Sequence, residues 1–282
     1  MDLGIHAYAW CSEWSNDTLN ILDKAKEQDL DFLEIPLMCL DKFDARAVLK
    51  RKKEVGIDVV TSNVILDAEF DITSTEVSHR KKGVEYLKKC VDATAAVESD
   101  CFSGVIYSQY LKPAKRPPTN DEWQYSADCL REVAEYAKKC NINIGFEPVT
   151  RYESYLLNTC EQALKLIDMI GLDNVKVHLD TYHMNVEEKD FYHATKAAKG
   201  KLIHYHLCEC DRGIPGTGHV DWDGVFRALK EINYNGRVGM EGFSDITDNM
   251  STWVWRKLAP NGDVFLTEGI RFIRNMIKKY NL

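Results

Sequence analysis

The sequence lacks several features that mark whole classes of protein. No apolar run approaches the roughly 18 residues that a membrane-spanning helix needs. The first residues, M-D-L-G-I-H, contain neither the basic stretch nor the long apolar stretch of a secretory signal. The nine cysteines are odd in number and include no C-x-x-C pair, which suits reduced thiols better than a disulfide framework. We therefore expect a cytoplasmic protein that does not associate with a membrane.

The chain also lacks an excess of positive charge. Its 36 Lys and Arg residues are outnumbered by 44 Asp and Glu residues, which gives a formal net charge of -8 at pH 7. Nucleic-acid binding depends on neutralising phosphates with a basic surface, so this balance argues against a nucleic-acid partner. We expect a small-molecule ligand instead.

A glycine-rich phosphate turn of the G-x-G-x-x-G kind follows none of the strand-like runs, which argues against an open doubly wound sheet. We also expect no organic cofactor. An apolar content of 45% and a charged content of 28% are typical of a soluble globular protein with a sizeable core. The 282 residues could form two average domains, but a single α/β barrel of about 250 residues is equally ordinary. The internal pattern has to decide.

Four short apolar runs in the second half of the chain each end in a potential metal ligand. Each is rich in β-branched or aromatic residues and precedes a segment of helical periodicity, which is typical of parallel strands joined by helices. The runs are N-I-N-I-G-F before Glu147, V-K-V-H-L before Asp180, L-I-H-Y before His206 and R-V-G-M before Glu241. Successive ligands are 33, 26 and 35 residues apart, on the order of one strand-helix unit.

The first half of the chain continues this alternation. Strands are predicted at residues 3–9, 31–36, 57–63 and 101–106. Helices are predicted at about 16–28, 44–56, 75–97, 119–140, 159–170, 190–198, 221–232 and 264–279, the first with Asn16 or Asp17 as its N-cap. Eight strand-helix units predict a single (β/α)8 TIM barrel domain over residues 1–282, with an open doubly wound sheet as the alternative.

In a parallel barrel the four ligands would meet at the rim formed by the carboxyl ends of the strands, where barrel enzymes carry their active sites. Three carboxylates crowd together only when a cation offsets their repulsion, so the arrangement predicts a divalent metal. Oxygen ligands with one nitrogen favour Mn²⁺, Mg²⁺ or Co²⁺ over a metal bound by soft thiolates. Of these we expect Mn²⁺.

Each residue also has a simpler interpretation. A glutamate at a strand end, taken singly, is usually a solvated or salt-bridged rim residue. His206, Cys208 and Cys210 alternate along the chain and could form a zinc site, although a second Cys/His cluster is missing.

Three further polar residues closely follow the predicted ligands. Glu153, His183 and Arg212 lie in segments that we expect to be loops above the metal, where charged groups can hold hydroxyls or orient a ligand. The alternatives are a surface ion pair for Glu153 and Arg212 and a satisfied loop histidine for His183. We also expect His6, Trp14 and Tyr110 to bind substrate.

At these residues the sequence resembles the ketose 3-epimerases, the group of D-tagatose 3-epimerase and D-psicose (D-allulose) 3-epimerase within the xylose isomerase-like TIM barrels. The matching stretches are F-E-P-V-T-R-Y-E-S-Y-L-L-N-T, V-K-V-H-L-D-T-Y-H-M-N-V-E-E, H-L-C-E-C-D-R-G-I-P-G-T-G-H-V-D-W, M-E-G-F and W-R-K-L. The resemblance runs from Gly4 nearly to the C-terminus and is most specific between Glu147 and Glu241.

The resemblance implies that Glu147, Asp180, His206 and Glu241 hold the metal and that the two glutamates exchange protons with the substrate. It also implies that the three loop residues hold the ketose oxygens near C1 to C3. The family's glycine pair and Y-W after strand four stand here as Ser103-Gly104 and Gln109-Tyr110, its M-E-P-F is M-E-G-F, and the strand-three loop S-N-V-I-L-D lacks the G-P-S-like turn. These departures surround the distal part of the substrate and bear on the identity of the sugar.

The predicted function is inversion of C3 of a ketose through a cis-enediolate, with Glu147 and Glu241 as the acid/base pair. The same site could serve an aldose-ketose isomerase, an inosose dehydratase-like lyase or a lyase acting on a 3-keto sugar or glycoside. Metal-dependent endonucleases share the barrel type but need a basic face, and a non-catalytic sugar-binding barrel is a further alternative.

Two segments bear on further contacts. The run K-P-A-K-R from Lys112 to Arg116 could grip a substrate phosphate or be a solvated basic loop. Trp253 and Trp255 could form a partner surface or cap the barrel floor. We expect a homodimer or a homotetramer.

Overall fold

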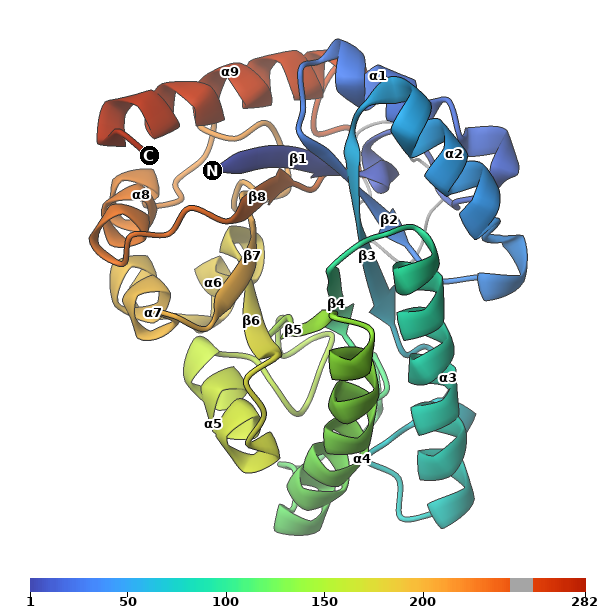
Figure 1. Cartoon of the computed structure of the whole chain (residues 1–282). Helices are drawn as coiled ribbons and strands as arrows, with labels where there is room; N and C mark the ends of the chain where they lie inside the picture. The colour runs from blue at the N-terminus through green and yellow to red at the C-terminus, as the bar shows by residue number, and fades with distance from the viewer. Residues whose placement is uncertain (244–255) are drawn as a thin grey trace.

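The predicted strands pair in chain order into a closed parallel barrel (Figure 1). The computed structural model describes residues 1–243 and 256–282. Closure is made by β1 (Asp2–His6) and β8 (Arg237–Met240), which place Gly4 opposite Gly239. The remaining strands are β2 (Phe32–Pro36), β3 (Asp58–Val64), β4 (Cys101–Val105), β5 (Asn143–Phe146), β6 (Val175–Asp180) and β7 (Leu202–His206). The barrel prediction is confirmed, and the open doubly wound sheet is excluded.

Helices form a ring around the outside of the barrel (Figure 1). They are α1 (Ile21–Glu27), α2 (Ala45–Val55), α3 (Val77–Ala96), α4 (Asn120–Lys139), α5 (Cys160–Ile170), α6 (Thr181–Glu187), α7 (Phe191–Ala197), α8 (Trp222–Glu231) and α9 (Gly262–Tyr280), with short 3-10 turns η1 (Ala7–Ala9), η2 (Asn16–Thr18), η3 (Leu40–Lys42) and η4 (Ala68–Phe70). Capping boxes at Thr119 and Thr159 fix the starts of α4 and α5 by satisfying their free backbone N–H groups. Of the helices in these two described ranges, none has both the length and the apolar character that a membrane span requires.

The first unit differs from its prediction. The strand ends at His6, because the Nδ1 atom of His6 accepts the backbone N–H of Tyr8 at 3.2 Å and turns the chain into η1. The predicted caps Asn16 and Asp17 lie inside η2, and the capping box belongs to Ser15. A single helix from residue 16 was therefore wrong; α1 begins only at Ile21.

The sixth unit contains a helix that was predicted as a loop. Asp180 ends β6 and is also the N-cap of α6, since its Oδ1 atom accepts the backbone N–H of Tyr182 at 2.7 Å. The predicted loop residue His183 therefore lies on the first turn of a helix. A helix of only seven residues is too short for apolar periodicity to reveal it.

The interior of the barrel changes from apolar to polar along its axis. Near the amino ends of the strands, Phe32, Val60 and Cys101 form a small apolar cluster of their own. Above it lie the buried polar side chains of His178 and His204. The main apolar core lies elsewhere, between the strands and the helical ring, and includes Leu33, Val59, Leu130 and Phe226. The barrel interior is therefore polar toward the carboxyl ends of the strands.

Gly104 in β4 is required by the close approach of two strands. Its φ angle is +122°, and a Cβ atom there would lie 2.3 Å from the carbonyl oxygen of Asn63 on β3. An L-residue would be strained both by the dihedral angle and by the backbone contact. Glycine at this position sets the wall of the barrel mouth between β3 and β4.

We expect Gly104→Ala to lower the free energy of unfolding by about 1–3 kcal/mol, because alanine must hold an unfavourable φ next to a backbone oxygen. Denaturant unfolding followed by circular dichroism measures this loss. The matched control is Ser103→Ala, whose buried hydroxyl has no hydrogen-bond partner among the described residues, so that its removal should leave stability close to that of the wild type. Equal stability of both variants would contradict the strain at Gly104.

Candidate metal centre and substrate pocket

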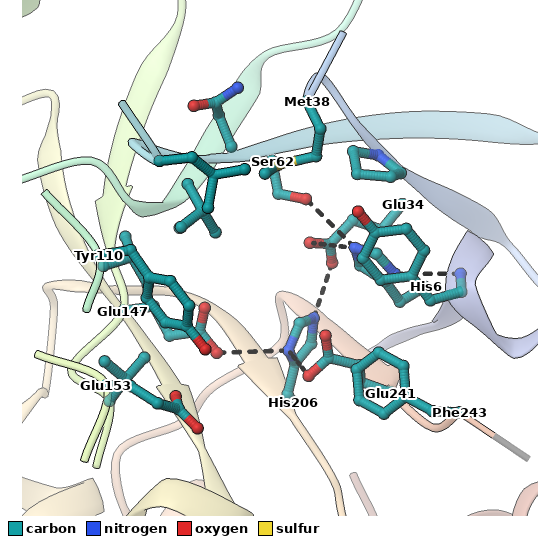
Figure 2. Close-up of a pocket in the computed structure, with 18 of the residues that line it drawn as sticks. His6, Glu34, Met38, Ser62, Tyr110, Glu147, Glu153, His206, Glu241 and Phe243 are labelled. Carbon is teal, nitrogen blue, oxygen red and sulfur yellow. Dashed lines mark hydrogen bonds and ion pairs between the residues drawn. The ribbon is translucent and has the colours of Figure 1, made fainter. Parts of the chain in front are cut away.

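The four predicted ligands meet at the carboxyl ends of four consecutive strands. Glu147 directly follows β5, Asp180 ends β6, His206 ends β7 and Glu241 directly follows β8. One ligand atom from each lies within 4.8 Å of those from the other three. Figure 2 shows His206 between the carboxylates of Glu147 and Glu241. The convergence predicted from strand spacing is therefore present.

The distances in this cluster fit a cation between the side chains. The Nδ1 atom of His206 lies 3.6 Å from Glu147, 3.9 Å from Asp180 and 3.5 Å from Glu241. It is buried and has no hydrogen-bond partner within the described part of the chain. Ligands that each bind one ion at about 2.0–2.2 Å lie roughly 3–4 Å from one another, so these separations suit a shared ion better than direct hydrogen bonds.

The charges of the cluster are partly compensated by the protein itself. Burial alone would lower the pKa of His206, but the carboxylates of Glu34 and Glu147 hold it well above its ordinary value. Burial raises the pKa of Glu147. Burial would also raise the pKa of Asp180, but Arg212, His183 and His206 together outweigh that effect and lower it. A bound cation would supply the same compensation in competition with the His206 proton.

Arg212 forms one wall of the site. It is buried, forms an ion pair with Glu241, and places its Nη2 atom 3.3 Å from the Asp180 carboxylate. The guanidinium lies over the ring of Tyr182 at 4.4 Å and over that of Phe243 at 5.2 Å. Its backbone adopts a left-handed φ of +63°, a strained conformation of the kind often retained at functional sites.

His183 and Glu153 continue this wall. The Nδ1 atom of His183 lies 3.6 Å from the Glu153 carboxylate, and its Nε2 atom lies 3.0 Å from Arg212. Burial raises the pKa of Glu153 to about 7 and lowers that of His183 to about 3. A neutral imidazole and a carboxyl group that titrates near neutrality can both exchange hydrogen bonds with hydroxyl groups. These are contacts within the cavity, so the interpretation as surface ion pairs is wrong.

A cavity of about 340 Å³ opens in front of the candidate metal ligands. All six predicted substrate-binding residues line it: His6, Trp14, Tyr110, Glu153, His183 and Arg212. Tyr8 and Phe243 lie at its mouth with ring centroids 5.9 Å apart. Its size is at the small end of ligand pockets, which span roughly 300–1,000 Å³, and suits a monosaccharide.

Three buried polar residues beneath the ligands were not predicted. Glu34 on β2 is 1% exposed and bonds the predicted ligand His206, while His178 and His204 are each 0% exposed. The available signals were an acid within the apolar run F-L-E-I-P, and histidines two residues before Asp180 and His206, which share their face of the strand.

The alternative zinc set is not assembled. The thiol of Cys208 donates to the carbonyl oxygen of Glu241 at 3.4 Å, and the Sγ atom of Cys210 lies 3.2 Å from the Nδ1 atom of His219, away from His206. Neither cysteine belongs to the groups of converging ligand atoms found in residues 1–243 and 256–282.

The basic run after β4 is held by carboxylates outside the cavity. Lys112 lies 2.8 Å from Asp71, and Arg116 lies 2.8 Å from Glu122. None of the three cations of the run, Lys112, Lys115 and Arg116, lines the substrate cavity in the described structure. Trp253 and Trp255, the other segment considered for contacts, lie outside the described residues.

Comparison with known proteins identifies the family. The model of the xylose isomerase-like TIM barrels matches residues 22–276. The chain belongs to this family. Ketose 3-epimerase from Arthrobacter globiformis is 33% identical over 282 residues, which cover 98% of this chain and 97% of that protein. L-ribulose 3-epimerase from Mesorhizobium japonicum is 33% identical over 261 residues, which cover 91% and 87%.

A solved structure agrees with these relatives. The crystal structure of D-allulose 3-epimerase from Methylomonas sp. in complex with D-allulose matches this xylose isomerase-like barrel with a TM-score of 0.93 at 32% identity, and the match covers 98% of this chain and 97% of that one. The resemblance to the ketose 3-epimerases is confirmed, and with it an enzyme of the isomerase class.

We expect Mn²⁺ to stabilise the metal-depleted protein against heat, because an ion bound only by the folded state raises its stability. At a hundred times the Kd this amounts to about 2.7 kcal/mol, or a rise in Tm of roughly 5–10 °C for a domain of this size. Differential scanning fluorimetry after EDTA treatment measures the shift.

Two variants test whether the four-residue cluster is responsible. Asp180→Asn keeps an oxygen to cap α6 but loses the charge of one ligand, so the shift should become clearly smaller. Asp173→Asn, on an exposed carboxylate paired with Lys138, should behave as the wild type. An undiminished shift in Asp180→Asn would place the ion elsewhere.

Proposed function

We propose that this protein inverts C3 of a free ketose through a cis-enediolate, with Glu147 and Glu241 as the acid/base pair. The observation that carries the proposal is the position of these two carboxylates. Glu147 follows β5 and Glu241 follows β8, three strands apart around the barrel, and both line the same cavity. Inversion at one carbon needs a proton removed from one face and delivered to the other, which two facing carboxylates can do.

The acidity of the reacting hydrogen depends on its neighbour. The C3 hydrogen of a ketose can be removed because the adjacent C2 carbonyl accepts the resulting charge as an enediolate. A divalent ion at the four ligands, for which we propose Mn²⁺, would act as a Lewis acid that offsets this charge. Glu147 and Glu241 then exchange roles as base and acid when the reaction runs in the opposite direction.

The cavity wall would hold the substrate in register. Arg212 keeps its charge under all physiological conditions and can donate to hydroxyl or carbonyl oxygens. Glu153 and His183, 3.6 Å apart, can bind neighbouring hydroxyls. Holding the oxygens near C1 to C3 in this way would place C3 between the two glutamates.

The charge of the cavity favours an unphosphorylated sugar. Its lining includes Glu13, Glu34 and Glu153 in addition to the two proposed acid/base residues. Arg212 is the one Arg or Lys among the lining residues in the described structure, and it already pairs with Asp180 and Glu241. A phosphate would find no free cation there. The relatives named above are also named for free sugars, L-ribulose and D-allulose.

We expect the epimer formed from a ketose in deuterated water to carry deuterium at C3, because the delivered proton comes from a glutamate that has exchanged with solvent. Nuclear magnetic resonance of free and phosphorylated ketopentoses and ketohexoses, incubated with Mn²⁺, measures the position of the label. An aldose product labelled at C2 would identify an isomerase, and loss of water or of a leaving group would identify a lyase; either would replace the proposed reaction.

We expect Glu147→Gln and Glu241→Gln each to lower kcat by about 10² to 10⁴-fold or more, since each removes a positioned proton-transfer group. Mn²⁺ binding should weaken only in part, because three ligands and the amide oxygen remain. Glu161→Gln, at an exposed site on α5, is the matched control and should keep full activity. Retained turnover in both active-site variants would refute the assignment.

A further inference from the structure

Glu34 is a buried carboxylate that the proposed reaction does not use. It lies on β2, across the barrel from Glu147 (Figure 2). Its Oε2 atom is 2.7 Å from the Nε2 atom of His206 and 2.7 Å from the Nε2 atom of His204. Its Oε1 atom faces the Nε2 atom of His6 at 3.8 Å. Three imidazoles from β1 and β7 thus surround one acid.

The chemistry of these groups fixes where the hydrogen on His206 lies. An ionised carboxylate only accepts hydrogen bonds, so each imidazole nitrogen 2.7 Å from it must carry a hydrogen. In a neutral His206 the lone pair is then on Nδ1. That atom is the one facing Glu147, Asp180 and Glu241. The ring presents a ligand atom to the cluster because its other nitrogen is occupied by Glu34.

The packing around the two rings holds this orientation. A Cβ atom on Gly239 of β8 would lie 3.1 Å from the Cε1 atom of His204 and 3.5 Å from the Cδ2 atom of His206. Glycine therefore leaves space for both rings. The ring of His178 packs edge-on against His206, with centroids 4.2 Å apart. The register of β6 and β7 shifts just before this layer, as expected where a bulge directs side chains at a functional site.

We propose that Glu34 is a positioning residue, which selects the tautomer and ring direction of His206 and strengthens its Nδ1 atom as a metal ligand. This inference rests on the metal centre of the proposed function. A histidine ligand is more basic when its other nitrogen donates to a carboxylate, and loss of such a partner typically costs 10 to 100-fold in metal affinity. His204 supplies a second donor, which keeps the carboxylate on His206 and away from the ion.

A different use of the same residues can be tested against this one. His178, His204 and His206 each offer a nitrogen within 4.8 Å of the other two, so they could hold an ion of their own. The two arrangements differ in stoichiometry: positioning requires one Mn²⁺ per chain at the four ligands, whereas a second centre requires two.

The central experiment is titration of Mn²⁺ into the metal-depleted full-length protein by isothermal calorimetry. We expect one ion per chain, and a Kd that rises about tenfold in Glu34→Gln and up to about 100-fold in Glu34→Ala. The matched control is His204→Gln at an equally buried site. Its side-chain amide can still donate to Glu34, and the contact between Glu34 and His206 is untouched, so its Kd should remain within about threefold of the wild type.

Further results separate positioning from a purely structural role. If Glu34 only stabilised the barrel, Glu34→Gln and His204→Gln would lower Tm alike and leave the Kd unchanged, which would overturn the proposal. Two Mn²⁺ ions per chain would also overturn it. Should the variants not fold, ¹⁵N resonances of the histidine rings in the wild type loaded with diamagnetic Mg²⁺ decide: His206 must carry its hydrogen on Nε2, and a ring with its hydrogen on Nδ1 would contradict the proposal.

The binding measurement contains no sugar, so its outcome is separate from that of the reaction. A wild-type protein that epimerises no ketose but shows the expected response to Glu34→Gln would remove the proposed function and leave the role of Glu34 intact. An active epimerase with an unchanged Kd in Glu34→Gln would support the proposed function and remove the positioning role of Glu34.

Discussion

Repulsion among three carboxylates, two of them buried and one partly buried, governs the organisation of this barrel. Parallel strands must end on the same rim, and Glu147, Asp180 and Glu241 end or follow three of them. Their charges cannot share so small a volume without positive partners. Arg212 supplies one, His206 another, and the geometry leaves space for a cation among them. This need for positive partners explains why Arg212 pairs with the carboxylates in the cavity wall. It also explains why histidines lie beneath them.

Much of this could be predicted from the sequence, for reasons that lie in particular residues. The positions of the predicted ligands followed from four strand-like runs spaced one strand-helix unit apart, because strand ends in a barrel share one rim. These runs end at Glu147, Asp180, His206 and Glu241. The capping residue Thr119 was correctly placed, since Thr119 and Glu122 form a recognisable box. Both inferences depend on local patterns that the tertiary structure does not override.

The failures have equally local causes. Helix α6 was missed because Asp180 is both the last residue of a strand and the N-cap of a helix, so that the boundary carries no separate signal. Glu34 was missed because its partners come from β1 and β7, far away in the chain. A single acidic residue in an apolar strand predicts that it has a polar partner, but it does not identify that partner. Contacts across a closed barrel are set by topology, and no spacing along one strand encodes them.

The polar axis of the barrel has a consequence for how such a protein can change over evolution. Inside the barrel, Phe32, Val60 and Cys101 form only a small apolar cluster. The main apolar core lies between the strands and the outer helices. Folding stability therefore depends mainly on the layer between strands and helices, whereas ligand recognition depends on residues at the mouth of the barrel. Residues at the mouth, such as His6 or Ser62, can be exchanged for others that fit a new sugar without removing the apolar contacts that keep the chain folded. A change of specificity therefore costs the scaffold little folding stability, which helps one architecture to serve many related substrates.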